Sequence, residues 1–183
     1  MDRNGAGFYT AGSRGAACYH RRVLTFLRFL MLLALVVWLG GIVFFGAVLA
    51  PTLFSTLPTR ELAGTVVTRS LGALHWIGIG AAVVFLAASL TLSTIKTGSA
   101  QPLAGRHLLV VAMLALTLAS QYFVSPRMLA LRRDMGTIDA VAPTDPRRLE
   151  FNRLHRYSTG LEQGVLLLGL IVLWRVAAEE KHS

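Results

Sequence analysis

Four long stretches almost without charge constrain the fold of this chain more than any other feature. Residues 29–59, 70–95 and 107–126 contain no Asp, Glu, Lys or Arg. Residues 157–174 contain a single charged residue, Glu162. A helix needs about 20 apolar residues to cross the hydrocarbon core of a bilayer, and backbone amides inside lipid must be hydrogen bonded within their own segment. The pattern therefore predicts four membrane-spanning helices.

The predicted spans and their connections use nearly the whole chain of 183 residues, of which 54% are hydrophobic. The sequence therefore predicts a polytopic membrane protein of the all-α class, a bundle of four transmembrane helices within one domain at residues 23–178. The expected spans are at about residues 24–50, 71–95, 107–125 and 157–175. Residues 1–22, rich in Gly, Ala and Ser, predict a disordered basic tail, and residues 179–183 predict a short C-terminal tail.

The connections between the predicted spans differ in character. Span one is expected to end at Pro51 because proline interrupts a helix, and residues 61–69 are expected to form a short interfacial helix. Residues 126–156 form a polar helical connection that extends helices three and four beyond the bilayer. Within it, Asp145-Pro146 is typical of a helix start.

The net charge of +9 comes mainly from arginines that flank the apolar runs. At those positions basic side chains contact anionic lipid headgroups, so the lipid bilayer is the predicted partner and nucleic acid is not. We call the side of the two termini side A and the opposite side B. Lys and Arg divide evenly between the two sides, although the arginines beside span one favour an N-terminus inside the cell. The pattern leaves a homo-oligomer open and identifies no substrate.

Polar residues of the predicted spans concentrate toward side B, because alternating spans bring the start of span two, the end of span three and the start of span four together. Thr117, Gln121 and Ser125 are spaced by four residues and form a stripe on one helix face. A second stripe, with spacings of three, four and three residues, lies on span four and contains Asn152, His155, Thr159 and Glu162. The candidate polar site is His75, Gln121, Ser125, Arg127, Asn152, His155, Thr159 and Glu162.

These side chains have two interpretations. In the functional one, Glu162 takes up a proton or binds a cation, and His75 and His155 are metal or haem ligands. In the structural one, the same groups hydrogen bond between helices and stabilise the bundle. The structural interpretation is favoured for the two histidines, whereas both stay open for Glu162, because intramembrane carboxylates commonly have a function.

Two groups of sequence motifs resemble a known family. The first group lies in predicted span one and directly after it, and consists of LRFL at 27–30, WLGG at 38–41, FFG at 44–46 and APTLF at 50–54. The second group is SPRM at 125–128 and FNRLHRYS at 151–158. Over residues 24–175 the chain resembles bacterial members of the transmembrane-protein-205-like family. The resemblance implies a four-span protein of a bacterial inner membrane without an established reaction, and it implies the family-pattern residues Pro51, Pro126, Arg127, Asn152, His155 and Ser158.

A more distant likeness is to copper-resistance-D-type membrane proteins, which also carry Trp-x-Gly-Gly in an early span. In those proteins a histidine lies about two helical turns before the tryptophan, where this chain has Met31. The likeness implies haem or copper as an alternative cofactor.

The sequence thus supports two hypotheses for function. The first is a non-enzymatic membrane protein without a cofactor, which handles an ion or small solute or acts as a membrane scaffold, with its site at side B. The second is a haem- or metal-binding redox protein that uses His75 and His155. No Walker motif, dinucleotide-binding loop, Ser-His-Asp set or HExxH motif occurs in the chain, so no enzyme active site is predicted.

Overall fold

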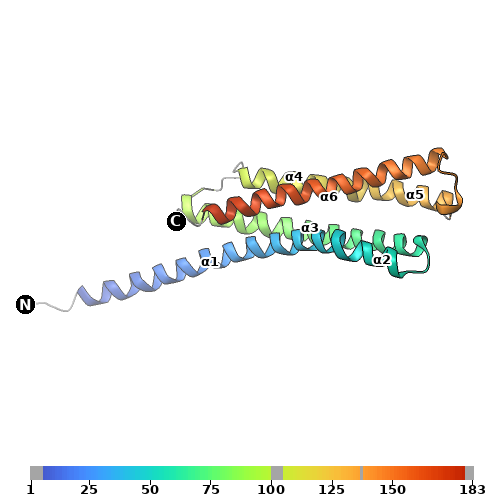
Figure 1. Ribbon diagram of the computed structural model, residues 1–183. Coiled ribbons are helices and arrows are strands. Elements are labelled where there is room, and N and C mark those ends of the chain that lie inside the picture. Colours follow the sequence, from blue (N-terminus) through green and yellow to red (C-terminus); the bar gives the residue numbers. More distant parts are fainter. Residues whose placement is uncertain (1–5, 100–104, 137, 180–183) are drawn as a thin grey trace, which may run out of the picture.

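Four long helical runs lie side by side in the computed structural model, which describes residues 6–99, 105–136 and 138–179 (Figure 1). The elements are α1 (Ala6–Phe44), η1 (Phe45–Leu49), α2 (Ala50–Thr56), α3 (Arg60–Thr97), α4 (Gly105–Ala119), η2 (Ser120–Val124), α5 (Ser125–Met135), η3 (Ile138–Ala140) and α6 (Pro146–Glu179). Four runs are long and apolar enough to cross a membrane, namely Tyr19–Thr56, Arg60–Thr97, Gly105–Met135 and Pro146–Ala178. The predicted all-α bundle of four membrane helices is confirmed.

The N-terminal segment differs from the prediction of a disordered tail over residues 1–22. Helix α1 begins at Ala6 and continues without interruption into the first span, and it projects beyond the other helices at the end of the bundle where both termini lie (Figure 1). Extending an existing helix by one residue costs far less than nucleating a new one, and alanine has the highest helix propensity. Residues 1–5 and 180–183 lie outside the described residues.

Proline does not end the first span, contrary to the expectation for Pro51. The helix runs on through the π-helical turn η1 into α2, and Pro51 is in the first turn of α2. The π turn is closed by a bond from the Ala50 amide to the Phe45 carbonyl, five residues earlier. This wider turn accommodates the proline, whose ring would clash with the fourth preceding carbonyl in a regular α-helix.

The third span repeats this arrangement. The π-helical turn η2 is closed by a bond from the Ser125 amide to the Ser120 carbonyl, and Pro126 follows directly in α5. In both spans the proline is therefore the second residue after a five-residue π turn. The two turns are equivalent features of the first and third helical runs, and both lie toward side B.

The connection predicted for residues 51–70 is much shorter in the structure. Only residues 57–59 interrupt the helices, and Thr59 caps α3 by accepting a hydrogen bond from the Leu62 amide at 3.2 Å. The interfacial helix expected at residues 61–69 is instead the beginning of α3. A polar cap satisfies the free amides of a helix start, so α3 begins more than two turns before its apolar stretch.

Helix α6 begins where the sequence predicts, at Pro146 after Asp145. The Arg147 amide donates to Asp145 Oδ1 at 2.8 Å, and the Arg147 guanidinium contacts the same carboxylate at 2.9 Å. The hydrogen bonds and charge of Arg147 lower the pKa of Asp145 from 3.8 to about 2. From this cap α6 continues as one helix of 34 residues to Glu179, which is longer than the about 20 residues that cross a hydrocarbon core.

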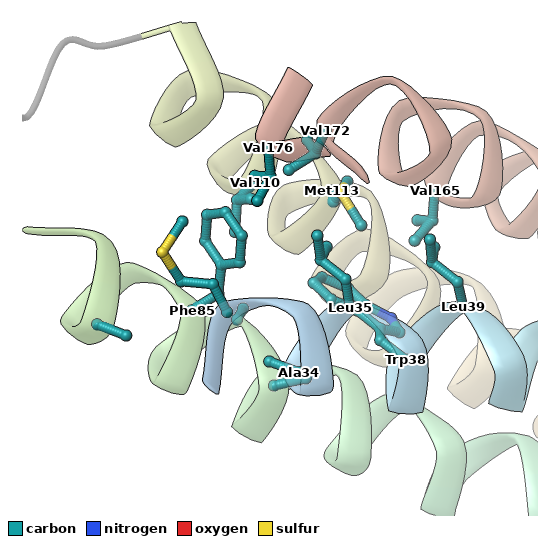
Figure 2. Close-up of a cluster of buried hydrophobic side chains, with 14 of the residues drawn as sticks. Ala34, Leu35, Trp38, Leu39, Phe85, Val110, Met113, Val165, Val172 and Val176 are labelled. Carbon is teal, nitrogen blue, oxygen red and sulfur yellow. The ribbon is translucent and has the colours of Figure 1, made fainter. Parts of the chain in front are cut away.

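The main core lies in the half of the bundle nearer side A. Figure 2 shows side chains of α1, α3, α4 and α6 converging there, with Leu35, Phe85 and Met113 all at most 1% exposed. The helices approach closely. Trp38 packs directly on Gly78 of α3, where an added Cβ would lie only 2.8 Å from the indole Cε2 atom. Small residues at helix contacts permit such packing in membranes.

Toward side B the bundle divides into two pairs of helices. Helix α2 packs on α3, and α5 packs on α6 (Figure 1). The second pair has its own small apolar cluster of Leu131, Met135 and Phe151. Because each pair packs within itself, space is left between the two pairs at side B, where the candidate polar residues lie.

Candidate functional site

A buried histidine joins three of the four spans. His75 of α3 is 1% exposed. Its Nδ1 atom lies 2.6 Å from Gln121 Oε1 of the π turn η2, and its Nε2 atom lies 2.7 Å from Glu162 Oε1 of α6. The polar stripes predicted for spans three and four therefore meet at His75, a contact that the stripe pattern itself left open.

The hydrogen-bonding capacity of these groups limits where protons can be. A neutral imidazole has one donor nitrogen and one acceptor nitrogen, whereas an imidazolium donates from both. Two oxygen acceptors around His75 suit an imidazolium beside a Glu162 carboxylate. If the Gln121 amide presents its NH₂ group instead, a neutral His75 accepts from Gln121 and donates to Glu162. The cluster can thus hold or release a proton while every nitrogen of the ring stays hydrogen bonded.

The local backbone explains how Gln121 reaches the cluster. Gln121 is the second residue of the π turn, and Pro126 follows that turn. A π turn inserts extra backbone into a helix and changes the direction of the side chains beyond it. Thr117, one turn earlier, is buried but donates to the Met113 carbonyl of its own helix at 3.0 Å. The polar stripe is therefore engaged with another helix only where the backbone departs from α geometry.

A cavity of about 830 Å³ opens between the two helix pairs, and we call it the side-B groove. Its apolar wall comes mainly from α1, η1, α2 and α3, and includes Ile42, Val43, Phe45, Ala47, Ala50, Phe54, Val67, Leu71 and Leu74. Its polar wall comes mainly from α5 and α6. Glu162 connects the groove with the buried cluster, since its side chain lines the cavity, is 15% exposed and bonds to His75.

The structure brings most of the candidate residues to this groove. Four of them line it beside Glu162, namely Ser125, Asn152, His155 and Thr159. Gln121 and His75 lie behind Glu162 as its hydrogen-bonded partners. Arg127 does not join the groove. Its side chain is 62% exposed and pairs with Glu150 at 3.0 Å, because its position on α5 points away from the facing helix pair.

The geometry does not favour His75 as a metal or haem ligand. Both of its ring nitrogens are already bonded to side-chain oxygens, so ligation would require the loss of one bond. His155 lines the groove and is exposed. Within the described part of the chain, no group of three or more His, Cys, Asp or Glu side chains is arranged to hold a metal ion.

Sequence reasoning missed the arginines at the outer end of the groove. Arg60, Arg132 and Arg148 all line it. Arg132 lies over the Phe151 ring, 5.6 Å from its centroid. The charge of these arginines predicts contacts with lipid headgroups rather than a place in a groove, and the signal that identifies Arg132 is its position on the helix face that carries Met128, which also lines the groove.

A second buried histidine was also missed. His107 of α4 is 2% exposed and lies 2.7 Å from the Ser89 hydroxyl of α3. Neither residue stands out in the sequence, because His107 follows Arg106 at the start of the third apolar run and serine is common in membrane helices. This contact joins α3 and α4 in the side-A half, far along both helices from the groove.

The helices, the buried polar cluster and the groove together define a polytopic α-helical membrane protein. Residues 33–137, more than half of the chain, match the family described as a domain of unknown function (DUF4149), and the chain belongs to that family. The match includes His75 and Gln121 and ends before Glu162. No curated protein and no solved structure matches the chain.

Proposed function

We propose that this integral membrane protein binds a small solute in the side-B groove and couples its binding to a proton held by His75 and Glu162. One observation carries the proposal. Glu162 faces the groove on one side and hydrogen bonds the fully buried His75 on the other, at 2.7 Å. A proton taken up at the groove surface thus has a direct path to a buried acceptor.

Energetic considerations favour this interpretation over a purely structural one. Desolvating two ionisable groups costs several kcal/mol for each, on the order of what their attraction returns. Well-packed apolar side chains stabilise a bundle equally well or better. Ionisable residues within membrane spans commonly mark ion and substrate pathways. The position of Glu162 beside a cavity, rather than within a closed core, agrees with such a pathway.

The cellular context of the proposal comes from the resemblance to the transmembrane-protein-205-like family over residues 24–175. We propose the inner membrane of a bacterium as the location. A membrane-scaffold role is the alternative, and the buried hydrogen bonds among His75, Gln121 and Glu162 would serve it by joining three helices.

Flux measurements in proteoliposomes test the proposal. Purified protein is reconstituted, a proton or monovalent-cation gradient is imposed, and a pH-sensitive dye or an ion electrode follows its decay. We expect the wild-type protein to accelerate the decay of the proton gradient over protein-free vesicles. Glu162→Gln is expected to abolish this effect, because an amide cannot take up a proton.

Glu150→Gln is the matched control, since Glu150 lies on the same helix and pairs with Arg127 on the exposed surface. It is expected to retain wild-type flux. Equal flux for the wild-type protein and Glu162→Gln with every cation tested would remove Glu162 from the mechanism and leave the scaffold role. An absorption spectrum of the same preparation, made with haem supplied, tests the redox alternative, which requires a Soret band that His75→Ala removes.

A further inference from the structure

The outer end of the side-B groove is positively charged. Arg60 begins α3, Arg132 is on α5 and Arg148 is near the start of α6, and all three line the cavity. Glu61 is the one carboxylate that lines the groove beside them among the described residues. Among the side chains that the structure describes, none of the three guanidinium groups forms an ion pair with a carboxylate within 4.0 Å. Three guanidinium groups and one carboxylate therefore leave this end of the groove with an excess of positive charge among the described residues, which Glu61 offsets in part at Arg132.

Arg132 is held in a specific position at this end. Its guanidinium lies over the Phe151 ring at 5.6 Å from the centroid. It also lies against the backbone of α3 at Gly64, where an added Cβ would be 2.5 Å from one guanidinium nitrogen and 2.9 Å from the other. A side chain on residue 64 would displace it. The contacts with Phe151 and Gly64 leave the guanidinium fixed across the groove rather than free to extend into water.

Arg148 is positioned in a similar way by a different contact. Its guanidinium donates a hydrogen bond to the Val141 carbonyl, which belongs to the turn between η3 and α6. A guanidinium has five N–H donors, so one bond to a carbonyl leaves several for another acceptor. Two fixed guanidinium groups at one end of a cavity suit an anion that has several oxygens, such as a phosphate ester.

The remainder of the groove suits an acyl chain. From the arginines inward, the wall formed by η1, α2 and α3 is apolar, with Phe54, Ala47, Val67 and Leu71 along its length. The lining residues of α3 extend from Arg60 to Leu74, roughly 20 Å at the rise of an α-helix. That length is about the thickness of one leaflet with its headgroup layer, since a whole bilayer measures about 40–45 Å.

We propose that the side-B groove binds one anionic phospholipid of the surrounding bilayer, with its phosphate between Arg132 and Arg148 and an acyl chain along the apolar wall. The inference rests on the proposed function, because it names the class of solute that the same groove takes. Charge complementarity and the matching length favour a lipid over a water-soluble anion, which would leave the apolar wall without a contact. Glu162, at the inner end, would then lie beside the acyl chain rather than the headgroup.

Native mass spectrometry tests this proposal. The full chain is reconstituted in bilayers of equal parts phosphatidylglycerol and phosphatidylcholine with identical acyl chains, and the lipids that remain bound after mild delipidation are identified. We expect the wild-type protein to retain phosphatidylglycerol preferentially. Arg132→Gln is expected to reduce this preference by about tenfold, the effect of losing one charged hydrogen-bonding group.

Arg133→Gln is the matched control, because Arg133 is the exposed neighbour on the same helix and does not line the groove. It should retain the wild-type preference. Ala47→Phe tests the other end of the ligand without touching an arginine, since Ala47 is an exposed residue of the apolar wall. Its added ring should reduce retention of both lipids, and a wild-type unfolding temperature shows for each variant that the bundle is intact.

Several results would overturn the inference. They are equal retention of the two lipids by the wild-type protein, an unchanged preference in Arg132→Gln, and complete competition by inorganic phosphate, which would indicate a soluble anion. A dimer without bound lipid would indicate that a second copy of the chain covers the groove, and would overturn it as well. Glu162→Gln separates the two proposals. If Glu162→Gln loses proton flux but the wild-type protein shows no lipid preference, only the lipid site is contradicted. If the wild-type protein shows a lipid preference but its flux does not depend on Glu162, only the proton coupling is contradicted.

Discussion

The two halves of the bundle pack differently, since the helices close around a core near side A and separate into two pairs near side B. Near side A, four helices close around Leu35, Phe85 and Met113, each at most 1% exposed, and glycine contacts such as Trp38 on Gly78 bring the backbones together. Near side B, the helices separate into two pairs around a groove of about 830 Å³. Lipid is as apolar as a helix surface, so shape rather than hydrophobicity decides which half closes.

The boundary between the halves coincides with the polar cluster and the π turns. Gln121 lies in η2, and η1 contributes Phe45 and Ala47 to the groove wall. Each π turn therefore lies where its helix leaves the closed half. The comparison indicates that the closed half provides most of the stability, whereas the separated half contains the groove and the polar cluster at which we propose that a ligand and a proton bind.

The largest expected effect is a difference in the free energy of unfolding between variants of two phenylalanines, one in each half. Phe85 of the closed half is 1% exposed, whereas Phe54 of the groove wall is 50% exposed. Phe85→Ala should reduce the free energy of unfolding by about 3 kcal/mol, mostly through the cavity that it leaves. Phe54→Ala should cost less than about 1 kcal/mol, because its ring already borders open space. Unfolding of both variants in mixed micelles by a denaturing detergent provides the measurement.

Similar losses for the two variants would contradict the contrast between the halves. Such a result would mean that the groove wall is packed in the bilayer as tightly as the main core. Val83→Ala is the control for α3, since Val83 is 59% exposed and faces away from the bundle. Its effect should lie within about 0.5 kcal/mol of zero.

A smaller effect is expected at the boundary, from the hydrogen bond between His75 and Glu162. A double-mutant cycle of His75→Ala and Glu162→Ala should give a coupling free energy of about 1 to 2 kcal/mol, the range for interhelical polar pairs in membranes. A second cycle, made from His75→Ala and Thr159→Ala, is the control. Thr159 is on the same helix as Glu162 but donates to the His155 carbonyl, so its coupling with His75 should be near zero.

A coupling near zero for His75 and Glu162 would mean that each side chain finds an equivalent partner when the other is removed. The cluster would then be unsuited to hold a proton at a defined place. A coupling well above that range would instead indicate a fully ionic pair, which is more strongly stabilised in a low-dielectric interior than a neutral hydrogen bond.

The fold was predictable from the sequence because membrane spans depend on a property that each segment carries by itself. A run without charge, such as residues 29–59, has few alternatives to a helix inside lipid. Where the prediction differed, neighbouring backbone decided the outcome. Pro51 is accommodated by a π turn, and the residues before span two join α3 because Thr59 caps that helix. Neither feature is visible in hydropathy.

The site was only partly predictable, since its geometry depends on contacts between spans. Periodicity placed Gln121 and Glu162 on polar stripes, but the convergence of both on His75 depends on how the helices rotate and on the turn η2. The spacing of Arg132 from Met128 places both residues on one helix face, but it does not show that this face lines a groove. The place of Arg132 in the groove follows from contacts with Phe151 and Gly64, which are distant in the chain.

The smallest expected effect lies outside the membrane, at the cap that begins α6 in the separated half. Arg147 lowers the pKa of Asp145 from 3.8 to about 2, first through its side-chain hydrogen bond. A depressed carboxylate pKa stabilises the folded state fully above the unfolded value, and this contribution disappears as the pH falls from about 4 to 2. We therefore expect the unfolding temperature of the wild-type protein to fall over this interval more than that of Asp145→Asn, which retains a capping oxygen without titrating. Arg147→Gln should remove most of the same pH dependence, since it removes the first cause of the shift. If Asp145→Asn and the wild-type protein follow one pH curve, the cap contributes nothing through its charge, and α6 is held at side B by its packing on α5 alone.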